Sequence, residues 1–272
     1  MRNVVVLLST ALLAVLSTAA IAETKLIHAG ALLAVPGDRP QRDQTIVVEN
    51  DRITEIRRGF VAASEFGGAE VIDLKDHFVL PGLMDMHVHL QGEMGPNRDR
   101  DALKMSSELM QMRSIMYAMR TLMAGFTTLR DVGNSGQEMY ALRDAINNGW
   151  IDGPRIIAAG GVGITGGHAD VSGVKPEFME FLTDASVCDG PFDCRRAARN
   201  EIKYGADLIK ITSTGGVMTD RATGTGQQME ADEITEIVRA AARMGRKVAS
   251  HAHHEDGIVA ALEGGVASIE HG

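Results

Sequence analysis

The 272-residue sequence predicts an α/β protein built on a TIM-type (β/α) barrel. The barrel is expected to be incomplete, with about six of eight strands, and to follow a small N-terminal β-sandwich portion. From residue 82 onward, short apolar runs alternate with longer amphipathic ones, which is the pattern of parallel β/α units. Several of these short runs end in histidine or lysine, and barrel strands carry their chemistry at that end.

Each barrel element can be placed by its pattern. Strands are expected at residues 83–89, 126–131, 155–159, 206–212, 247–252 and 266–270. Helices are expected at residues 101–124, 135–148, 192–204, 230–244 and 256–264. The helix over 230–244 has the clearest signals, because its apolar residues repeat at helical spacing, Glu230 lies at its start and Gly245 follows its end.

The chain is expected to have three parts. Residues 1–22 have a short positive start, a 13-residue apolar run and small residues before Ala22, which predicts a signal peptide cleaved there and a secreted or periplasmic protein. Residues 23–80 hold the β-sandwich portion, in which Asn50-Asp51 separates two β-rich runs and predicts a hairpin turn. Residues 81–272 form the partial barrel.

Composition limits the classes of partner. The sequence is 44% hydrophobic and 23% charged, as in ordinary globular proteins, with a formal net charge of −9. Its basic residues are scattered, so nucleic acid is not expected as a partner, and the acidic balance argues against binding to anionic membranes after signal cleavage. A small-molecule substrate is the expected partner, and homo-oligomerisation stays open.

Cys188 and Cys194 lie in a loop that contains glycine and proline. In an oxidising compartment the two side chains could close a small disulfide loop. Two free thiols are the alternative, and without a second pair of cysteines the spacing is a weak signal for zinc.

The strongest chemical signal is a set of histidines and one lysine at strand ends. His87 and His89 are two residues apart, so they point to one face of a strand, and paired imidazoles suit a divalent metal. Lys210, His251 and His271 fall where three further strands should finish. A single histidine or lysine at such a position is more often a core or loop residue with its hydrogen bonds satisfied. All of these residues together indicate one shared metal site.

Lys210 lies in an apolar strand with no acid near it in sequence. Burial favours the neutral amine, which can react with carbon dioxide to give a carbamate. The two oxygens of that anion could bind two metals held about 3.5–4 Å apart.

Four stretches then resemble the amidohydrolase superfamily: PGLMDMHVHL, GADLIKI, KVASHAHHEDGI and GVASIEHG. More narrowly, they resemble its imidazolonepropionase-related branch, which includes zinc-dependent Xaa-Pro dipeptidases. The resemblance runs from about residue 24 to the last residue. It implies two zinc ions bridged by carboxylated Lys210, with His87 and His89 on one metal and with His251 and His271 on the other. It further implies that His168 and His253 lie near the substrate.

The function that this resemblance implies is a metal-dependent hydrolase of amide or peptide C–N bonds. Dipeptides or N-acyl amino acids would be attacked by a metal-activated hydroxide, and an imidazolonepropionase-like cyclic amide hydrolase is the runner-up. The family uses an aspartate from strand eight as its proton shuttle, and no catalytic residue can be assigned to that role in this sequence. We therefore expect a fragment of a longer gene product; a truncated, non-catalytic metal-binding chain is the alternative.

Overall fold

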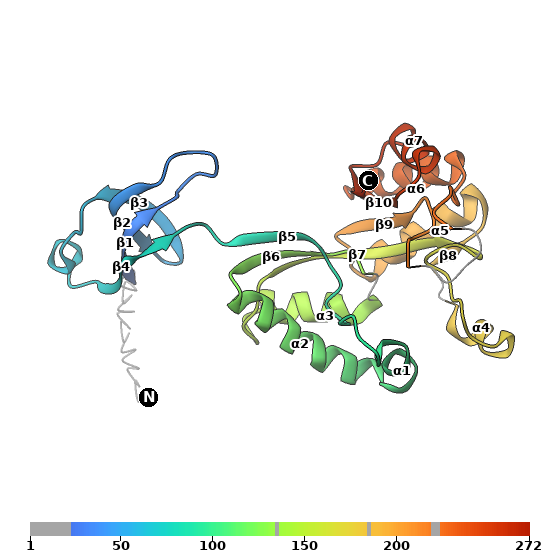
Figure 1. Cartoon of the computed structure of the whole chain (residues 1–272), viewed down its shortest axis with the longest axis horizontal. Helices are drawn as coiled ribbons and strands as arrows, with labels where there is room; N and C mark the ends of the chain where they lie inside the picture. The colour runs from blue at the N-terminus through green and yellow to red at the C-terminus, as the bar shows by residue number, and fades with distance from the viewer. Residues whose placement is uncertain (1–22, 134–135, 184–185, 219–223) are drawn as a thin grey trace, which may run out of the picture. The chain divides into compact units, whose positions relative to one another are not determined.

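The structure is a computed structural model that describes residues 23–133, 136–183, 186–218 and 224–272 (Figure 1). The predicted signal peptide, residues 1–22, lies outside the described residues. The chain divides into two compact units with the boundary after Pro81. Within the described residues, no helix has the length and apolar character needed to cross a membrane.

The N-terminal unit is one four-stranded sheet with the strand order β3-β2-β1-β4. Its strands are β1 (Thr24–Leu32), β2 (Gln41–Glu49), β3 (Arg52–Arg58) and β4 (Glu70–Val79), and the short helix η1 (Ala63–Phe66) precedes β4. The predicted hairpin is confirmed: β2 and β3 are antiparallel, and Asn50 and Asp51 adopt φ values of 49° and 63°. Two consecutive positive φ values are what a type I′ turn requires.

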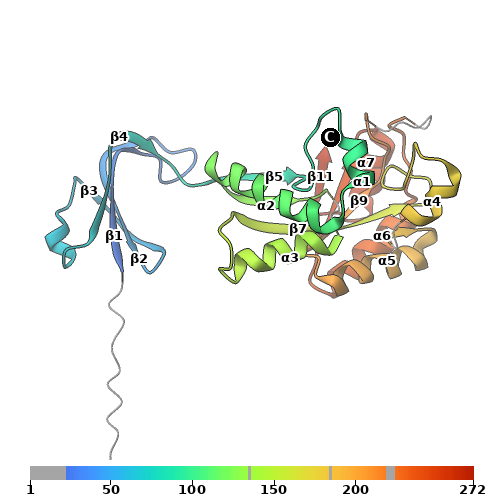
Figure 2. The same cartoon turned by 90° about the horizontal axis from the view of Figure 1, so that it is seen from below.

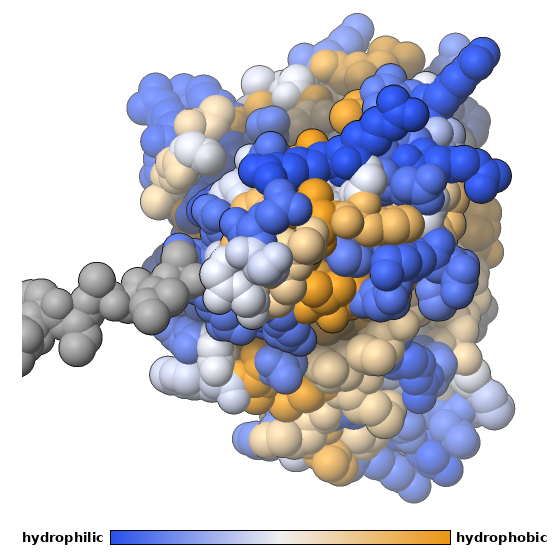
Figure 3. Space-filling view, turned by 90° about the vertical axis from the view of Figure 1, so that its left-hand side faces the viewer, coloured by the Kyte–Doolittle hydropathy of each residue, from blue (hydrophilic) through white to orange (hydrophobic). Residues whose placement is uncertain are grey.

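The surface of the N-terminal unit mixes apolar and charged side chains. Figure 3 shows orange apolar groups interspersed with blue hydrophilic ones on the face that it presents. Exposed apolar residues of this unit include Ile53, Ile56, Val71 and Phe78. Single exposed apolar side chains of this kind are common on folded proteins.

The second unit is built on six parallel strands in the order β11-β10-β9-β7-β6-β5 (Figures 1 and 2). They are β5 (Leu83–Val88), β6 (Phe126–Asp131), β7 (Arg155–Ile164), β9 (Leu208–Thr212), β10 (Val248–Ala252) and β11 (Ser268–His271). The two-residue strand β8 (Val187–Cys188) pairs with β7. The sheet curls like part of a barrel wall, because His87 on β5 contacts Glu270 on β11 although these strands end the strand order. The predicted incomplete TIM-type fold is therefore confirmed.

Helices connect the strands, and most were predicted. They are α1 (Arg98–Lys104), α2 (Ser107–Met123), α3 (Gly136–Asn147), α4 (Pro176–Leu182), α5 (Gly190–Tyr204), α6 (Ala231–Arg243) and α7 (Glu255–Glu263). The single helix expected over 101–124 is instead two, because Met105 is extended and the Ser106 hydroxyl caps α2 by accepting from Leu109 N. The seven-residue α4 was missed because it has no buried face to give its sequence a period.

The core of this unit lies between the sheet and the helices that cover its outer side. On β9, Ile209 and Ile211 face this core, while Lys210 faces the other side of the sheet because strand side chains alternate. Ile234 and Ile237 of α6 are fully buried in the same cluster. Burying one such side chain contributes about 1.5–3 kcal/mol. This packing fixes the strands whose other face carries the candidate site.

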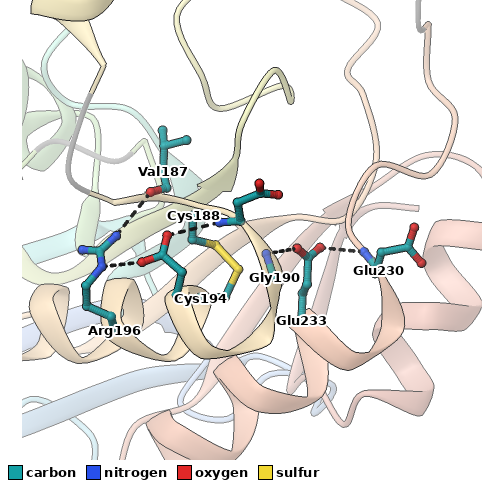
Figure 4. Close-up of a disulfide and its surroundings, with 9 residues drawn as sticks. Val187, Cys188, Gly190, Cys194, Arg196, Glu230 and Glu233 are labelled. Atoms are coloured by element: carbon teal, nitrogen blue, oxygen red, sulfur yellow. Dashed lines mark hydrogen bonds and ion pairs between the residues drawn. A yellow bond between two sulfur atoms is a disulfide. The ribbon is translucent and has the colours of Figure 1, made fainter.

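A disulfide joins Cys188 of β8 to Cys194 of α5 (Figure 4). Both side chains are buried, and the predicted bridge is confirmed over the alternative of two free thiols. Nearby, the Glu233 carboxylate accepts from Gly190 N and from Glu230 N, both at 2.8 Å. One buried side chain thereby caps the first turns of both α5 and α6.

Candidate metal centre

Four strand ends deliver the side chains that the sequence singled out. His87 lies on β5, Lys210 on β9, His251 on β10 and His271 on β11. His89 and His253 follow the ends of β5 and β10 by one residue, which keeps each on the same face as the histidine two residues before it. Parallel strands end at one edge of their sheet, so these groups share one rim.

The imidazole rings form one continuous cluster. His271 is central: its ring centroid lies 4.7 Å from that of His87, 4.6 Å from that of His251 and 5.0 Å from that of His253. His89 extends the cluster at one end, with its ring centroid 5.4 Å from that of His87. Ligand atoms of His251, His253 and His271 all lie within 4.8 Å of one another. The structure thus places His253, which was predicted to lie near the substrate, within ligand distance of the two predicted metal ligands His251 and His271.

The spacing of His87 and His89 fits a shared cation. Their Nε2 atoms are 3.4 Å apart. Two imidazole nitrogens bound at about 2.0–2.1 Å to one tetrahedral Zn²⁺ lie roughly 3.3–3.4 Å apart. The two rings therefore already have the separation that one zinc ion would impose.

Lys210 is buried among small strand neighbours. Its register partners are Gly161 on β7 and Ala249 on β10, and the residue is only 7% exposed. Burial lowers the pKa of Lys210 to about 8, against opposing attraction from Glu270. With this pKa, about a tenth of the side chain is neutral amine at pH 7 and about half at pH 8, and the neutral amine is the form that carboxylation requires.

Two of the histidines, His251 and His271, carry little charge near neutral pH. Burial, followed by the neighbouring His168, lowers the pKa of His251 to about 3. Burial also lowers the pKa of His271, and the nearby His87 adds to the effect. Neutral imidazole is the form that binds metals, so His251 and His271 suit a divalent cation.

A buried hydroxyl group is a second indication that this site could hold a bound metal. Thr212 follows Lys210 by two residues on β9 and so shares its face of the sheet. Its Oγ1 atom is buried and has no hydrogen-bond partner among the residues that the structure describes. A metal-bound group or carbamate next to the lysine would give this unpaired hydroxyl the hydrogen-bond partner that it lacks.

His168 and the neighbouring loops close one side of the cluster. Its ring centroid lies 4.5 Å from that of His251. Its backbone N–H donates to Gln228 Oε1 at 2.7 Å, and a Cβ atom on Gly216 would fall 2.5 Å from its ring. The predicted substrate-side residue is therefore held against a predicted metal ligand. His254 is exposed, and its Nδ1 atom caps α7 by accepting from Asp256 N.

Sequence reasoning missed two charged residues of the site, Arg130 and Glu270. Arg130 Nη2 donates to Glu270 Oε1 at 2.6 Å, and Glu270 Oε2 lies 2.9 Å from His87 Nδ1. Both are charged residues inside short apolar strands, which was the available signal. The neighbouring Asp131 is buried and accepts from Leu90 N and Gly133 N.

No acid from the described residues joins the group formed by His251, His253 and His271. No residue could be assigned from the sequence as the acid that transfers the proton, and this role therefore stays unassigned. The lysine and the histidines can bind metal ions and orient a substrate, and we assign no general base among the described residues.

The chain is similar to known proteins over most of its length. The chain is 41% identical to a Xaa-Pro dipeptidase crystallised with methionine in its active site, with a TM-score of 0.84 over 92% of this chain and 61% of that one. It is 29% identical to the ochratoxinase of Aspergillus niger, over 92% of this chain and 54% of the relative; the crystal structure of A. niger ochratoxinase matches with a TM-score of 0.75. The chain thus spans about half the length of the curated relatives that it matches. The model of the amidohydrolase family matches residues 78–272, so the chain belongs to the amidohydrolase family.

Proposed function

We propose that this chain carries most of the metal centre of a hydrolase that cleaves amide or peptide C–N bonds in dipeptides or N-acyl amino acids. The observation that carries the proposal is the convergence of His87, His89, His251 and His271 with buried Lys210 on one rim. The similarity to a Xaa-Pro dipeptidase, and to a prolidase crystallised with N-methylphosphonate-L-proline at 30% identity, supports this substrate class.

The residues have distinct roles in this proposal. His87 and His89 would hold one divalent cation, His251 and His271 a second, and Lys210 as a carbamate would bridge them. Zinc ions there would acidify a water molecule and polarise the substrate carbonyl. His253 and His168, on the substrate side, would donate hydrogen bonds to the carbonyl oxygen as negative charge develops on it.

The proposal is tested by assaying Xaa-Pro dipeptides, N-acyl amino acids and a cyclic imidazolone amide in parallel. We expect zinc-dependent release of the free amino acid from the first two classes. Ring opening of the cyclic amide alone would favour the imidazolonepropionase-like alternative. Zinc binding without turnover of any of the three would favour a non-catalytic metal-binding chain.

Thr212→Val should change stability and zinc binding in opposite directions. Without metal, the variant removes a buried unpaired hydroxyl, so the free energy of unfolding should rise by about 1 kcal/mol. With zinc and bicarbonate present, the variant should bind zinc more weakly, because the bound group loses a donor. Urea unfolding and zinc titration measure the two effects. Thr121→Val is the control, because its hydroxyl already donates to Tyr117 O; equal behaviour of the two variants would contradict this role.

Gly216→Ala should impair substrate binding without removing metal. The added methyl would lie 2.5 Å from His168 Cε1, so the ring must shift. Losing one hydrogen bond worth about 1.5 kcal/mol raises KM roughly tenfold. Zinc content by mass spectrometry should stay unchanged. Gly92→Ala is the control because its methyl would meet open space; an unchanged KM in Gly216→Ala would argue against His168 at the substrate.

We also propose that the protein is exported to a secreted or periplasmic location. The Cys188–Cys194 disulfide supports an oxidising compartment, since such bridges are rare in the cytosol. Cleavage after Ala22 would leave Glu23 as the first residue, which mass spectrometry of the intact mature chain measures. A chain that keeps Met1 in a host with an export pathway would contradict this proposal.

A further inference from the structure

Arg130 connects the two strands that end the sheet. Its Nε atom donates to Met86 O on β5 at 2.7 Å. Its Nη1 and Nη2 atoms donate to Ser268 Oγ at 3.2 Å and to Glu270 Oε1 at 2.6 Å, both on β11. One guanidinium on β6 thus fixes the distance between β5 and β11 across the inner face.

The two carboxylate oxygens of Glu270 have different partners. Glu270 Oε1 accepts from both Arg130 and Ser268, the latter at 2.7 Å. Oε2 lies 2.9 Å from His87 Nδ1. Glu270 is 6% exposed, so little water competes for either oxygen.

The contact decides which nitrogen of His87 carries the proton. A carboxylate paired with arginine can only accept, so the Nδ1 atom of His87 must be the donor. In a neutral ring the lone pair is then on Nε2, and Nε2 is the atom that faces His89 Nε2 at 3.4 Å.

We propose that Glu270, itself held by Arg130, is a positioning residue that locks His87 in the Nδ1–H tautomer and aims its Nε2 lone pair at the cation shared with His89. Metal-binding histidines commonly use their second nitrogen in this way, and losing the partner costs about 10- to 100-fold in metal affinity. The cation itself rests on the proposed function, whereas the tautomer lock does not.

Glu270→Gln is the sharpest variant because it keeps the size of the side chain. With its amide oxygen accepting from Arg130, the variant turns its NH₂ group toward His87 Nδ1. That group donates, so it favours a lone pair on Nδ1 and a proton on Nε2, which opposes cation binding. Glu263→Gln is the matched control, since it removes the same charge from an exposed site at the end of α7.

The first measurement is the tautomer of His87 in the metal-free chain at pH 8, read from ¹⁵N chemical shifts. The His87 signals are assigned by their absence from His87→Gln. We expect Nδ1–H in the wild type and in Glu263→Gln, and Nε2–H in Glu270→Gln. A wild-type ring protonated at Nε2 overturns the inference without requiring any variant to fold.

The second measurement is zinc affinity by competition with a chromophoric chelator. We expect Kd for the weaker-bound equivalent to rise about 10- to 100-fold in Glu270→Gln and to stay unchanged in Glu263→Gln. Wild-type affinity in Glu270→Gln overturns the inference. A wild-type chain with the Nδ1–H tautomer that binds no zinc supports the lock and overturns the proposed metal centre, so the two failures are distinguishable.

Discussion

Under the proposed function, Lys210→Met is expected to lower the bound zinc from two ions to one per chain and, at the same time, to stabilise the metal-free fold. Methionine fills nearly the same volume but cannot form the proposed bridging carbamate. With one cation lost, the hydrolytic rate should fall by about 10²–10⁴-fold, because a Lewis-acid contact is worth several kcal/mol.

The gain in stability follows from the pKa of Lys210. Burial lowers this pKa from 10.5 to about 8. Below pH 8 the folded state holds an unfavourable buried ammonium, at a cost of at most about 3 kcal/mol. Between pH 8 and 10.5 the unfolded chain binds more protons than the folded one, so wild-type stability should rise with pH over that interval. Lys210→Met should lack this rise and be more stable at pH 7.

Urea unfolding at several pH values in the presence of a chelator measures both effects. Lys203→Met is the control, because Lys203 is an exposed lysine on α5 and its loss removes the same charge. The interpretation is wrong if Lys210→Met keeps two zinc ions per chain. A wild-type stability that falls between pH 8 and 10.5 would contradict the buried lysine.

Arg130→Met is expected to destabilise the second unit by about 3–5 kcal/mol, the cost of leaving one member of a buried ion pair alone. Glu270 stays buried with its charge, and Met86 O and Ser268 Oγ each lose a donor. Chemical denaturation measures the loss. Arg239→Met is the control: Arg239 pairs with Glu236 but is 55% exposed, so its removal should cost less than about 1 kcal/mol.

The double variant Arg130→Met/Glu270→Gln separates this ion pair from general damage. Removing both charges leaves no buried carboxylate without its partner, so the double variant should be less destabilised than the sum of the single ones. We expect a coupling free energy of about 1–3 kcal/mol. Strict additivity would mean that the contact between the two side chains carries no energy.

Much of this fold could be predicted because it depends on local patterns. The alternation of strands and helices after residue 82 follows from periodicity, and the Asn50-Asp51 hairpin follows from turn chemistry. The extension of β7 to Ile164 could not be predicted, since its glycines are typical of a loop. Tertiary packing explains why one of these residues is a glycine, because a Cβ on Gly160 would fall 2.4 Å from Glu201 Cβ on α5.

The candidate site was predictable to the extent that it obeys the period of two in strands. That rule places His87 with His89 and Lys210 with Thr212 on inner faces. The contact between Arg130 and Glu270 could not be predicted, because the residues are 140 positions apart and meet only where the sheet curls. Nor could sequence spacing show that the ring of His253 lies 5.0 Å from that of His271, only slightly farther than the 4.6 Å of His251.

The central claim is that these histidines and Lys210 gather two cations on one rim. X-ray absorption at the zinc edge, on the chain loaded with zinc in bicarbonate buffer, tests it most directly. The account predicts two ions per chain, a first shell of imidazole nitrogens and carbamate oxygens, and a metal–metal distance of about 3.5–4 Å. A single ion without a metal neighbour, or a spectrum unchanged by His251→Asn and His271→Asn, would contradict it.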